Sequence, residues 1–566
     1  MSRKFILLLI AVFALLPMSA SRLEKQGSAM RLIVNEKPFI IVGGELGNSA
    51  ATCSADIARN FRKLHDMGLN TVLVPVYWDL IEPEKGKFDF SLVDTILSDA
   101  RANDLKVVFL WFGAWKNSMS CYTPLWFKQD YRTYPRARTE SGKPLEIASA
   151  FSPAVFKADS EAFAALLNHI RTVDNDETVI MIQIENEIGM LEDARDYSPA
   201  AVAEYSKGVP SALISHLEKN KKSLHPSLLS KWKNAGMKKS GSWAEVFGDD
   251  IYTDELFMAY SYGRYVEGLA QIARSVLPDM PLYVNAAMNS RGRRPGEYPS
   301  AGPLAHLKDI WHAAAPSVDM LSPDLYDSGF TDWVRAYALP DNQLFIPEIR
   351  RRDGNAVQTL YVLGEHDAIG LSPFAIEGGS DSPSDRDNRG RAMIRELLPL
   401  VSANTGKGTM NGLYFDADSI TRTIPRDGIT VKASHYFTLP WDPRATDGSP
   451  WPVAGGIIIP AGGKGEYIIA GSGIVVEFDK PGNTPADTRN LGEDGFLNSG
   501  ADRKAGGAWS GRSRIGLGSV CEVKVAPDGS LTPVRYFNGD ETHQGRHVRI
   551  GVDDYKILLV RLYEYK

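Results

Sequence analysis

The alternation of apolar runs and amphipathic segments before residue 405 constrains the fold of this chain more than any other feature. The runs are apolar along their whole length, as strands buried on both faces are. Helical patterns separate them, and the longest covers residues 255–276. The eight runs lie at residues 38–45, 70–76, 105–111, 178–185, 281–286, 318–323, 343–348 and 368–374. Eight successive strand–helix units predict a (β/α)8 barrel, a TIM barrel.

A doubly wound parallel sheet is the alternative fold for the same alternation. Such a sheet normally carries a glycine-rich phosphate turn that opens a helix after an early strand. Only fragments of that pattern occur, GGELG at 43–47 and GSG at 471–473, and neither opens a convincing helix. We therefore expect the barrel, and we place it in residues 21–405.

The character of the sequence changes after residue 405. Helical patterns stop there, and glycine and proline punctuate short apolar runs such as GIIIP, EYIIAG and KILLVRLYEY. Short strands bounded by turn residues are typical of antiparallel sheets. Residues 406–566 are therefore expected to form a separate, sandwich-like antiparallel β domain.

The first 20 residues have the order of a secretory signal peptide. Arg3 and Lys4 precede an apolar run at 5–16, and small residues follow it. Twelve apolar residues are too few to span a bilayer, and no other stretch is long enough to do so. We expect the mature protein to be soluble and exported, either periplasmic or extracellular.

The charge balance limits the partners of the mature chain. Without residues 1–20 it carries 61 basic and 69 acidic residues, a net charge of −8. A mildly acidic surface without basic clusters argues against nucleic acid and anionic membranes as partners. A neutral or weakly charged ligand fits better.

Neither cysteine nor histidine indicates a metal or cofactor. The three cysteines allow one disulfide at most, and no pair of them has metal-ligand spacing. His543 and His547 have helical metal spacing but lie in a glycine-containing β segment, which disfavours zinc. We expect no metal and no cofactor.

The stretch TVIMIQIENEIGML at 178–191 raises the question of function, because an apolar strand ends in two carboxylates around an amide. In such a barrel the C-terminal ends of the strands form the active-site mouth. Glu185 and Glu187 end the fourth strand there, and Glu348 ends the seventh, roughly opposite. Paired carboxylates across a cleft are what cleavage of a glycosidic bond requires. Strand alternation points Glu185 and Glu187 the same way, so spacing does not choose between them.

Three segments resemble glycoside hydrolase family 35, a clan A family of β-galactosidases. The segment GLNTVLVPVYWDLIEPEKGKFDFS at 68–91 is similar to the region around the second strand of that family. IQIENEIG at 182–189 is close to its fourth-strand motif. NGDETHQGRHVRI at 538–550 is similar to the C-terminal β domain of a bacterial subgroup.

The resemblance implies roles for individual residues. Glu187 would be the general acid/base and Glu348 the nucleophile, and Asn186 would bind the sugar 2-hydroxyl. Tyr326, after the sixth strand in SPDLY beside Asp324, would lie against the nucleophile. Glu185 would then be structural.

The end of the third strand departs from the family pattern. The family usually has Cys-Ala-Glu-Trp there, and this chain has WFGAWKNS at 111–118. The glutamate that commonly binds galactose is therefore missing, and Trp115, Lys116 and Asn117 stand nearby. We take Trp115 and Asn117 as candidate sugar contacts, and Asn285, after the fifth strand, as another.

The longest connection between strands follows the fourth one, at 189–280. Long loops after barrel strands commonly build the wall of the mouth. We expect this insertion to fold over the mouth and Trp243 to reach the sugar or its leaving group, because aromatic faces stack on sugar rings.

Together these features predict a retaining exo-β-galactosidase that acts on terminal β-D-galactosyl residues of plant-type oligo- or polysaccharides. The first alternative is another clan A exo-glycosidase, a β-glucosidase or an arabinosidase. The second is a non-catalytic, glycan-binding barrel, against which the retention of both Glu187 and Glu348 argues.

Overall fold

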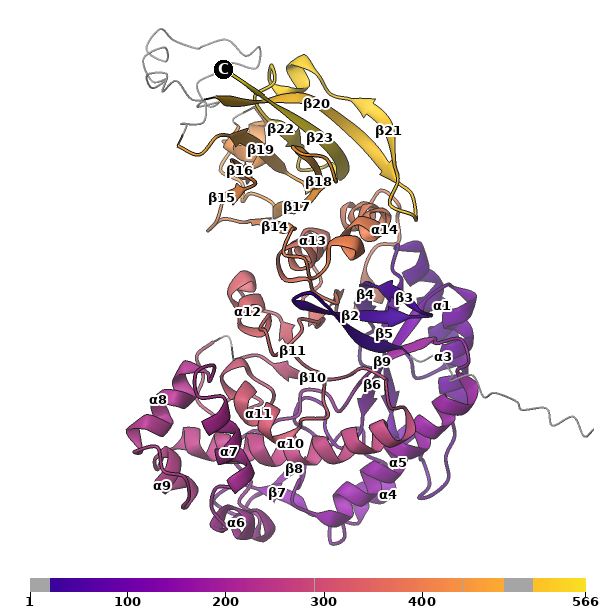
Figure 1. Ribbon diagram of the computed structural model, residues 1–566. Helices are drawn as coiled ribbons and strands as arrows, with labels where there is room; N and C mark the ends of the chain where they lie inside the picture. Colours follow the sequence, from indigo (N-terminus) through magenta and orange to yellow (C-terminus); the bar gives the residue numbers. More distant parts are fainter. Residues whose placement is uncertain (1–20, 290, 440, 483–512) are drawn as a thin grey trace, which may run out of the picture.

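The computed structural model describes residues 21–289, 291–439, 441–482 and 513–566 (Figure 1). The predicted signal peptide at 1–20 lies outside the described residues. Among the described helices, none combines the length and apolarity that crossing a bilayer would need.

Eight parallel strands close into a barrel in the order β10-β11-β12-β13-β4-β5-β6-β9. They are β4 (Ile41–Glu45), β5 (Thr71–Tyr77), β6 (Lys106–Phe112), β9 (Val179–Gln183), β10 (Leu282–Ala287), β11 (Met320–Leu325), β12 (Ile346–Ile349) and β13 (Gly370–Pro373). Each strand lies within or overlaps one of the eight predicted runs. The predicted barrel is confirmed, and the doubly wound sheet is excluded because the strands form a closed ring.

Helices surround the barrel strands (Figure 1). The longer ones are α1 (Ser54–Asp66), α3 (Ser91–Ala102), α5 (Pro153–Val173), α10 (Ile251–Val276), α13 (Asn355–His366) and α14 (Arg386–Asn404). Shorter ones are α2 (Trp78–Ile81), α4 (Leu125–Gln129), α11 (Lys308–Ala314) and α12 (Phe330–Tyr337). In α1 the buried residues Ile57, Phe61 and Leu64 recur at helical spacing, so one face of the helix packs on the barrel.

A small antiparallel sheet covers the N-terminal end of the barrel. It consists of β1 (Arg22–Gln26), β2 (Ala29–Val34) and β3 (Lys37–Phe39). Its backbone is bound by residues that precede barrel strands: Asn35 N donates to Glu177 Oε2 at 2.7 Å, and Met30 N to Gln343 Oε1 at 2.8 Å. The opposite, C-terminal end of the barrel is therefore the end that this sheet leaves uncovered.

The insertion after β9 forms four short helices beside α10. They are α6 (Pro199–Ser206), α7 (Ser211–Lys219), α8 (Pro226–Asn234) and α9 (Trp243–Phe247). Helix α9 contacts α8 and α10, α7 contacts α11, and α8 contacts the short η1 helix (Ala305–Leu307). The four helices gather around one end of α10 in Figure 1. The insertion therefore packs against helices on the outside of the barrel.

The C-terminal part contains two antiparallel sheets (Figure 1). The six-stranded sheet consists of β14 (Asn411–Phe415), β17 (Ala454–Pro460), β18 (Glu466–Ser472), β23 (Lys556–Tyr565), β20 (Arg514–Val525) and β21 (Leu531–Tyr536). The four-stranded sheet consists of β15 (Thr421–Arg426), β16 (Ile429–His435), β19 (Ile474–Asp479) and β22 (Val548–Ile550). Buried side chains from both sheets, including Leu413, Val431 and Ile469, share one core. The predicted antiparallel β architecture is confirmed.

The six-stranded sheet also packs on the barrel through α13. Gly364 of α13 lies against Ile457 of β17, and a Cβ at Gly364 would come within 2.6 Å of the Ile457 side chain. A glycine is needed at this close approach. The helix and the sheet therefore meet as one packed interface.

The three cysteines are free thiols. Cys53 and Cys121 are exposed, and Cys521 is buried. The single disulfide that the sequence allowed is not formed in this structure.

Candidate active site

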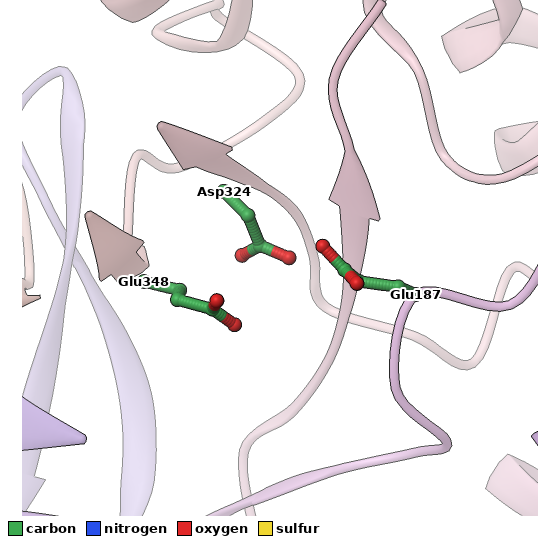
Figure 2. A group of neighbouring side chains, drawn as sticks. All are labelled: Glu187, Asp324 and Glu348. Carbon is green, nitrogen blue, oxygen red and sulfur yellow. The ribbon is translucent and has the colours of Figure 1, made fainter. Parts of the chain in front are cut away.

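Three carboxyl groups meet at the C-terminal end of the barrel. Glu187 follows β9, Asp324 lies in β11, and Glu348 lies in β12, where its Cα pairs with that of Asp324. Figure 2 shows the three side chains pointing toward one another, and one oxygen of each lies within 4.8 Å of the others. All three residues are nearly closed off from solvent, at 1–5% exposure. The predicted pairing of a fourth-strand with a seventh-strand carboxylate is thus present.

The backbone after β9 decides between Glu185 and Glu187. The strand ends at Gln183, and Glu185 and Glu187 adopt left-handed φ angles of 57° and 47°. The extended strand therefore does not continue through them, which was the condition for the two side chains to point the same way. Glu187 joins the carboxyl cluster and Glu185 does not.

Glu185 is packed into the barrel wall. It is fully buried, and its Oε2 accepts a hydrogen bond from Trp115 N at 2.8 Å. A Cβ on Gly113 would lie 2.8 Å from both Asp159 Oδ1 and Glu185 Oε1, so only glycine fits beside this pair. Burial, followed by the neighbouring Asp159 charge, raises the pKa of Glu185 well above its ordinary value. Glu185 is thus a structural residue.

Glu187 is held from two sides. The side-chain amide of Asn117 donates a hydrogen bond to Glu187 Oε2, and Lys116 Nζ donates to the oxygen of the same amide. Asn285 Oδ1 accepts a hydrogen bond from the backbone N–H of Glu187 at 2.9 Å. Asn117, predicted from the sequence as a sugar contact, lies directly beside the predicted acid/base.

Glu348 lies beside one phenol and near one ammonium group. Tyr326 donates its hydroxyl hydrogen to Glu348 Oε1, which is the contact predicted for this tyrosine. Burial is the main cause that raises the pKa of Glu348 to about 7, and repulsion from Glu187 adds to it. The charge of Lys116 and the Tyr326 hydrogen bond act in the opposite direction and favour the anion.

Two further carboxyl groups share this buried environment. Glu45 ends β4 and is 1% exposed, as is Asp324. Burial, followed by the charge of Glu348, raises the pKa of both carboxyls well above their ordinary values. Four closely coupled carboxyls do not all ionise at neutral pH, so the cluster retains protons beside an anion. An acid and an anion side by side are what acid-assisted nucleophilic chemistry uses.

Several buried polar atoms near the cluster have no partner among the described residues. They include both side-chain polar atoms of Asn186, Oε2 of Glu348, Oδ1 of Asp324, Oε2 of Glu45 and the hydroxyl of Tyr283. Buried polar atoms are normally hydrogen-bonded. A ligand rich in hydroxyl groups would supply the missing partners, and Asn186 agrees with its predicted role toward a sugar hydroxyl.

The structure corrects two aromatic candidates. Trp115 is fully buried, and its ring packs edge-on against Tyr262 and Tyr265. Trp243 is 1% exposed and packs with Phe247 and Phe257. Both predictions of a sugar contact are wrong, because the two rings pack in the hydrophobic core. The insertion was also expected to fold over the mouth, and its helices α7, α8 and α9 contact α11, η1 and α10.

Asn285 is also corrected, because both ends of its amide are used inside the protein. Its Oδ1 accepts from Glu187 N, and its Nδ2 donates to Asp324 Oδ2 at 2.7 Å. It supports Glu187, the predicted acid/base, rather than facing a sugar. Glu45, by contrast, was missed by sequence reasoning. A carboxylate at the end of the run 38–45 carries the same signal that singled out Glu187.

The carboxyl distances alone would also suit a cation. Hydrogen bonds from Asn117, Tyr326 and Asn285 already occupy one oxygen on each of the three carboxyls. The second oxygens of Glu348 and Asp324 have no partner among the described residues.

Two family models match the chain. Residues 31–240 match "Glycosyl hydrolases family 35", and residues 389–549 match "Domain of unknown function (DUF5597)". The first match includes the segment with Glu187 and confirms the resemblance found in the sequence. The second covers α14 and most of the two C-terminal sheets.

One curated relative and several solved structures are similar to parts of this chain. A "Beta-galactosidase" of Xanthomonas manihotis is 31% identical over 161 residues, which are 27% of this chain and 25% of that protein. A β-galactosidase structure from Rahnella sp. R3 has a TM-score of 0.44 at 15% identity, covering 65% of this chain and 57% of its own. A β-mannanase from the blue mussel Mytilus edulis has a TM-score of 0.39 at 14% identity, with 66% and 95% covered. The chain thus spans a quarter of the curated relative.

Proposed function

We propose that this chain, whose residues 31–240 match glycosyl hydrolases family 35, is a retaining exo-β-galactosidase. Its substrates would be terminal β-D-galactosyl residues of plant-type oligo- or polysaccharides. The observation that carries the proposal is the approach of the Glu187 and Glu348 carboxyl oxygens to within 4.8 Å.

The carboxyl separation supports retention of configuration. Retaining enzymes hold their two carboxyls about 5–5.5 Å apart, whereas inverting enzymes leave roughly 6.5–9.5 Å for a water molecule. The carboxyl oxygens of Glu187 and Glu348 lie within 4.8 Å of each other, which is nearer to the spacing of retaining enzymes. Direct attack by one carboxylate on the sugar is therefore the better-fitting mechanism.

In the first step, Glu348 attacks the anomeric carbon and the bond to the leaving oxygen breaks. Glu187 transfers its proton to that oxygen, so the aglycone leaves as an alcohol. In the second step, Glu187 takes a proton from water, whose oxygen attacks the anomeric carbon and releases Glu348. The sugar leaves with its original configuration, and both carboxyls return to their starting protonation.

Two interactions in the site act in the direction that this division of roles requires, against the net rise in the pKa of Glu348 to about 7. Tyr326 and Lys116 both favour the anionic form of Glu348, as a nucleophile requires. The carboxyls are at most 5% exposed. Such enclosure suits a single terminal sugar better than a polysaccharide passing through, which supports exo action.

The residues at the end of the third barrel strand favour a second candidate for the sugar that the enzyme prefers. The galactose-binding glutamate that related enzymes usually carry there is missing, and Lys116 and Asn117 stand nearby. A donor in place of an acceptor changes which hydroxyl orientation is favoured, so a β-glucosidase or an arabinosidase is the second candidate. Retention of the Glu187–Glu348 pair disfavours a non-catalytic, glycan-binding barrel.

The cellular location remains part of the proposal. The basic, apolar and small-residue order of residues 1–20 supports export to the periplasm or beyond. Plant-type oligosaccharides would be met there. Detection of the chain in the periplasmic or secreted fraction, without its first residues, tests this part.

A panel of nitrophenyl glycosides tests the function. We expect hydrolysis of the β-galactoside at the highest kcat/KM, and proton NMR should show β-galactose as the first product. Glu348→Gln serves as the inactive control. Preference for the β-glucoside or the arabinoside would replace the sugar assignment, and α-galactose as first product would exclude retention. No hydrolysis of any glycoside would leave the glycan-binding alternative.

A further inference from the structure

Asp324 is the one member of the three-carboxyl cluster to which the proposed mechanism gives no task. It lies in β11, is 1% exposed, and points toward Glu187 and Glu348 (Figure 2). A buried carboxyl beside two others raises the electrostatic cost of the cluster. Its contacts show what it does there.

A hydrogen-bonded chain links Asp324 to the backbone of the acid/base. Asp324 Oδ2 accepts from Asn285 Nδ2 at 2.7 Å, and Asn285 Oδ1 accepts from Glu187 N at 2.9 Å. Asn285 is 2% exposed and lies in β10, between the strands that carry the other two residues. One amide therefore bridges three neighbouring strands at the mouth.

The orientation of that amide matters because its two ends are chemically opposite. Asn285 satisfies the Glu187 N–H only when its oxygen faces Glu187 and its NH2 faces Asp324. The carboxyl of Asp324 accepts from the NH2 and thereby fixes this orientation. Without an acceptor at Asp324, nothing among the described contacts of Asn285 holds its NH2 away from Glu187.

Glu187 needs such support because its backbone is left-handed, with φ of 47°. A side chain with a Cβ adopts this conformation at a cost of about 1 kcal/mol or more, so the surroundings must hold it. Strand β9 ends at Gln183, and around Glu187 the backbone contacts are Asn186 N to Trp115 O at 3.3 Å and Ser118 N to Glu187 O at 3.2 Å. The N–H of Glu187 itself is bound by Asn285.

We propose that Asp324 is a positioning residue that acts through Asn285 to aim the Glu187 carboxyl at the leaving oxygen. This inference rests on the proposed function. Asp324 also lies directly against Glu187, with which it shares a side-chain hydrogen bond. Its expected effect is on the protonation step, which Glu187 serves. It therefore differs from a sugar-binding residue, which would affect every substrate equally.

The test compares Asp324→Leu with the conservative Asp324→Asn. Asp324→Asn keeps an oxygen acceptor for Asn285, so kcat/KM should stay within about threefold of wild type. Asp324→Leu removes it, and kcat/KM on an unactivated galactoside should fall about a hundredfold, the scale of a general-acid contribution. On a dinitrophenyl galactoside, which leaves without protonation, the fall should stay below about fivefold.

Asn285→Leu provides a second, independent variant in case Asp324→Leu does not fold. It should show the same dependence on the leaving group. The double variant should lose no more than either single one, because both residues act through the same bond. Equal losses on both substrates would overturn the inference and make Asp324 a sugar contact, and additive losses would overturn it as well.

Glu187→Gln separates this inference from the proposed function. If Glu187→Gln depends on the leaving group and Asp324→Leu does not, the function stands and the inference fails. If the wild-type protein hydrolyses neither galactoside, the proposed function fails and the inference with it. Thermal melting of each variant shows that the compared enzymes are folded.

Discussion

The hydroxyl of Tyr326 donates a hydrogen bond to Oε1 of Glu348, across the ends of the neighbouring strands β11 and β12. This bond favours the ionised form of Glu348 and fixes the direction of its carboxylate. Tyr326→Phe removes the bond but keeps the ring. We expect kcat/KM to fall about tenfold, the value of a hydrogen bond to a charged group. The acid limb of the pH profile should move to higher pH, and an unchanged profile would contradict this role.

Burial of Glu348 should make stability depend on pH. Its folded pKa of about 7 lies above the ordinary value of 4.5, so the folded state binds the proton more tightly. This contribution is fully present below pH 4.5 and is lost as the pH rises through 7. At about 1.4 kcal/mol per pH unit, the loss amounts to about 3–4 kcal/mol.

Glu348→Gln should therefore flatten the loss of stability between pH 4.5 and 8, as measured by urea unfolding. The matched control is Glu161→Gln, whose side chain is 63% exposed. It should leave the pH dependence of the wild type intact. A Glu348→Gln curve parallel to that of the wild type would show that Glu348 ionises freely.

Much of the fold follows from the sequence, because strands buried on both faces leave a clear pattern. Runs such as 70–76 and 105–111 are apolar except for Asn70, Thr71 and Lys106 near their starts, and each became a barrel strand. Glu348, at the end of the run 343–348, could be placed at the mouth because the barrel topology fixes where the C-terminal ends of the strands lie.

The local backbone at the site did not follow from the sequence. Strand alternation fails at Glu185 and Glu187 because both residues turn left-handed, which no pattern of residue types encodes. Asn285 was predicted to contact the sugar because its place after the fifth strand can be read from the sequence. Its contacts with Glu187 and Asp324 cannot be read from the sequence. Such contacts depend on which residues other strands bring alongside.

The two carboxylates of the Glu185-Asn186-Glu187 segment should behave differently on substitution. Glu187→Gln should reduce kcat/KM on an unactivated galactoside at least a hundredfold and on a dinitrophenyl galactoside far less. Glu185→Gln keeps an oxygen that accepts from Trp115 N, so it should change activity less than Glu187→Gln on the unactivated substrate. A greater loss for Glu185→Gln would reverse the assignment.

Trp243 should contribute to stability and not to substrate binding. It is 1% exposed among Phe247, Phe257 and Tyr260, so Trp243→Ala leaves a large cavity. We expect the free energy of unfolding to fall by about 3–5 kcal/mol while KM stays unchanged. Tyr252→Ala is the control near the insertion, because Tyr252 is 49% exposed. A raised KM in a stable Trp243→Ala protein would show that Trp243 contacts the sugar.

Trapping of the covalent intermediate tests the assignment of Glu348 most directly. A 2-deoxy-2-fluoro galactoside with a good leaving group forms the intermediate and slows its hydrolysis, so the labelled peptide can be found by mass spectrometry. The account predicts one fluorogalactosyl group on the carboxylate of Glu348. A label on Glu187, Asp324 or Glu45, or none on an enzyme that cleaves galactosides, would contradict it.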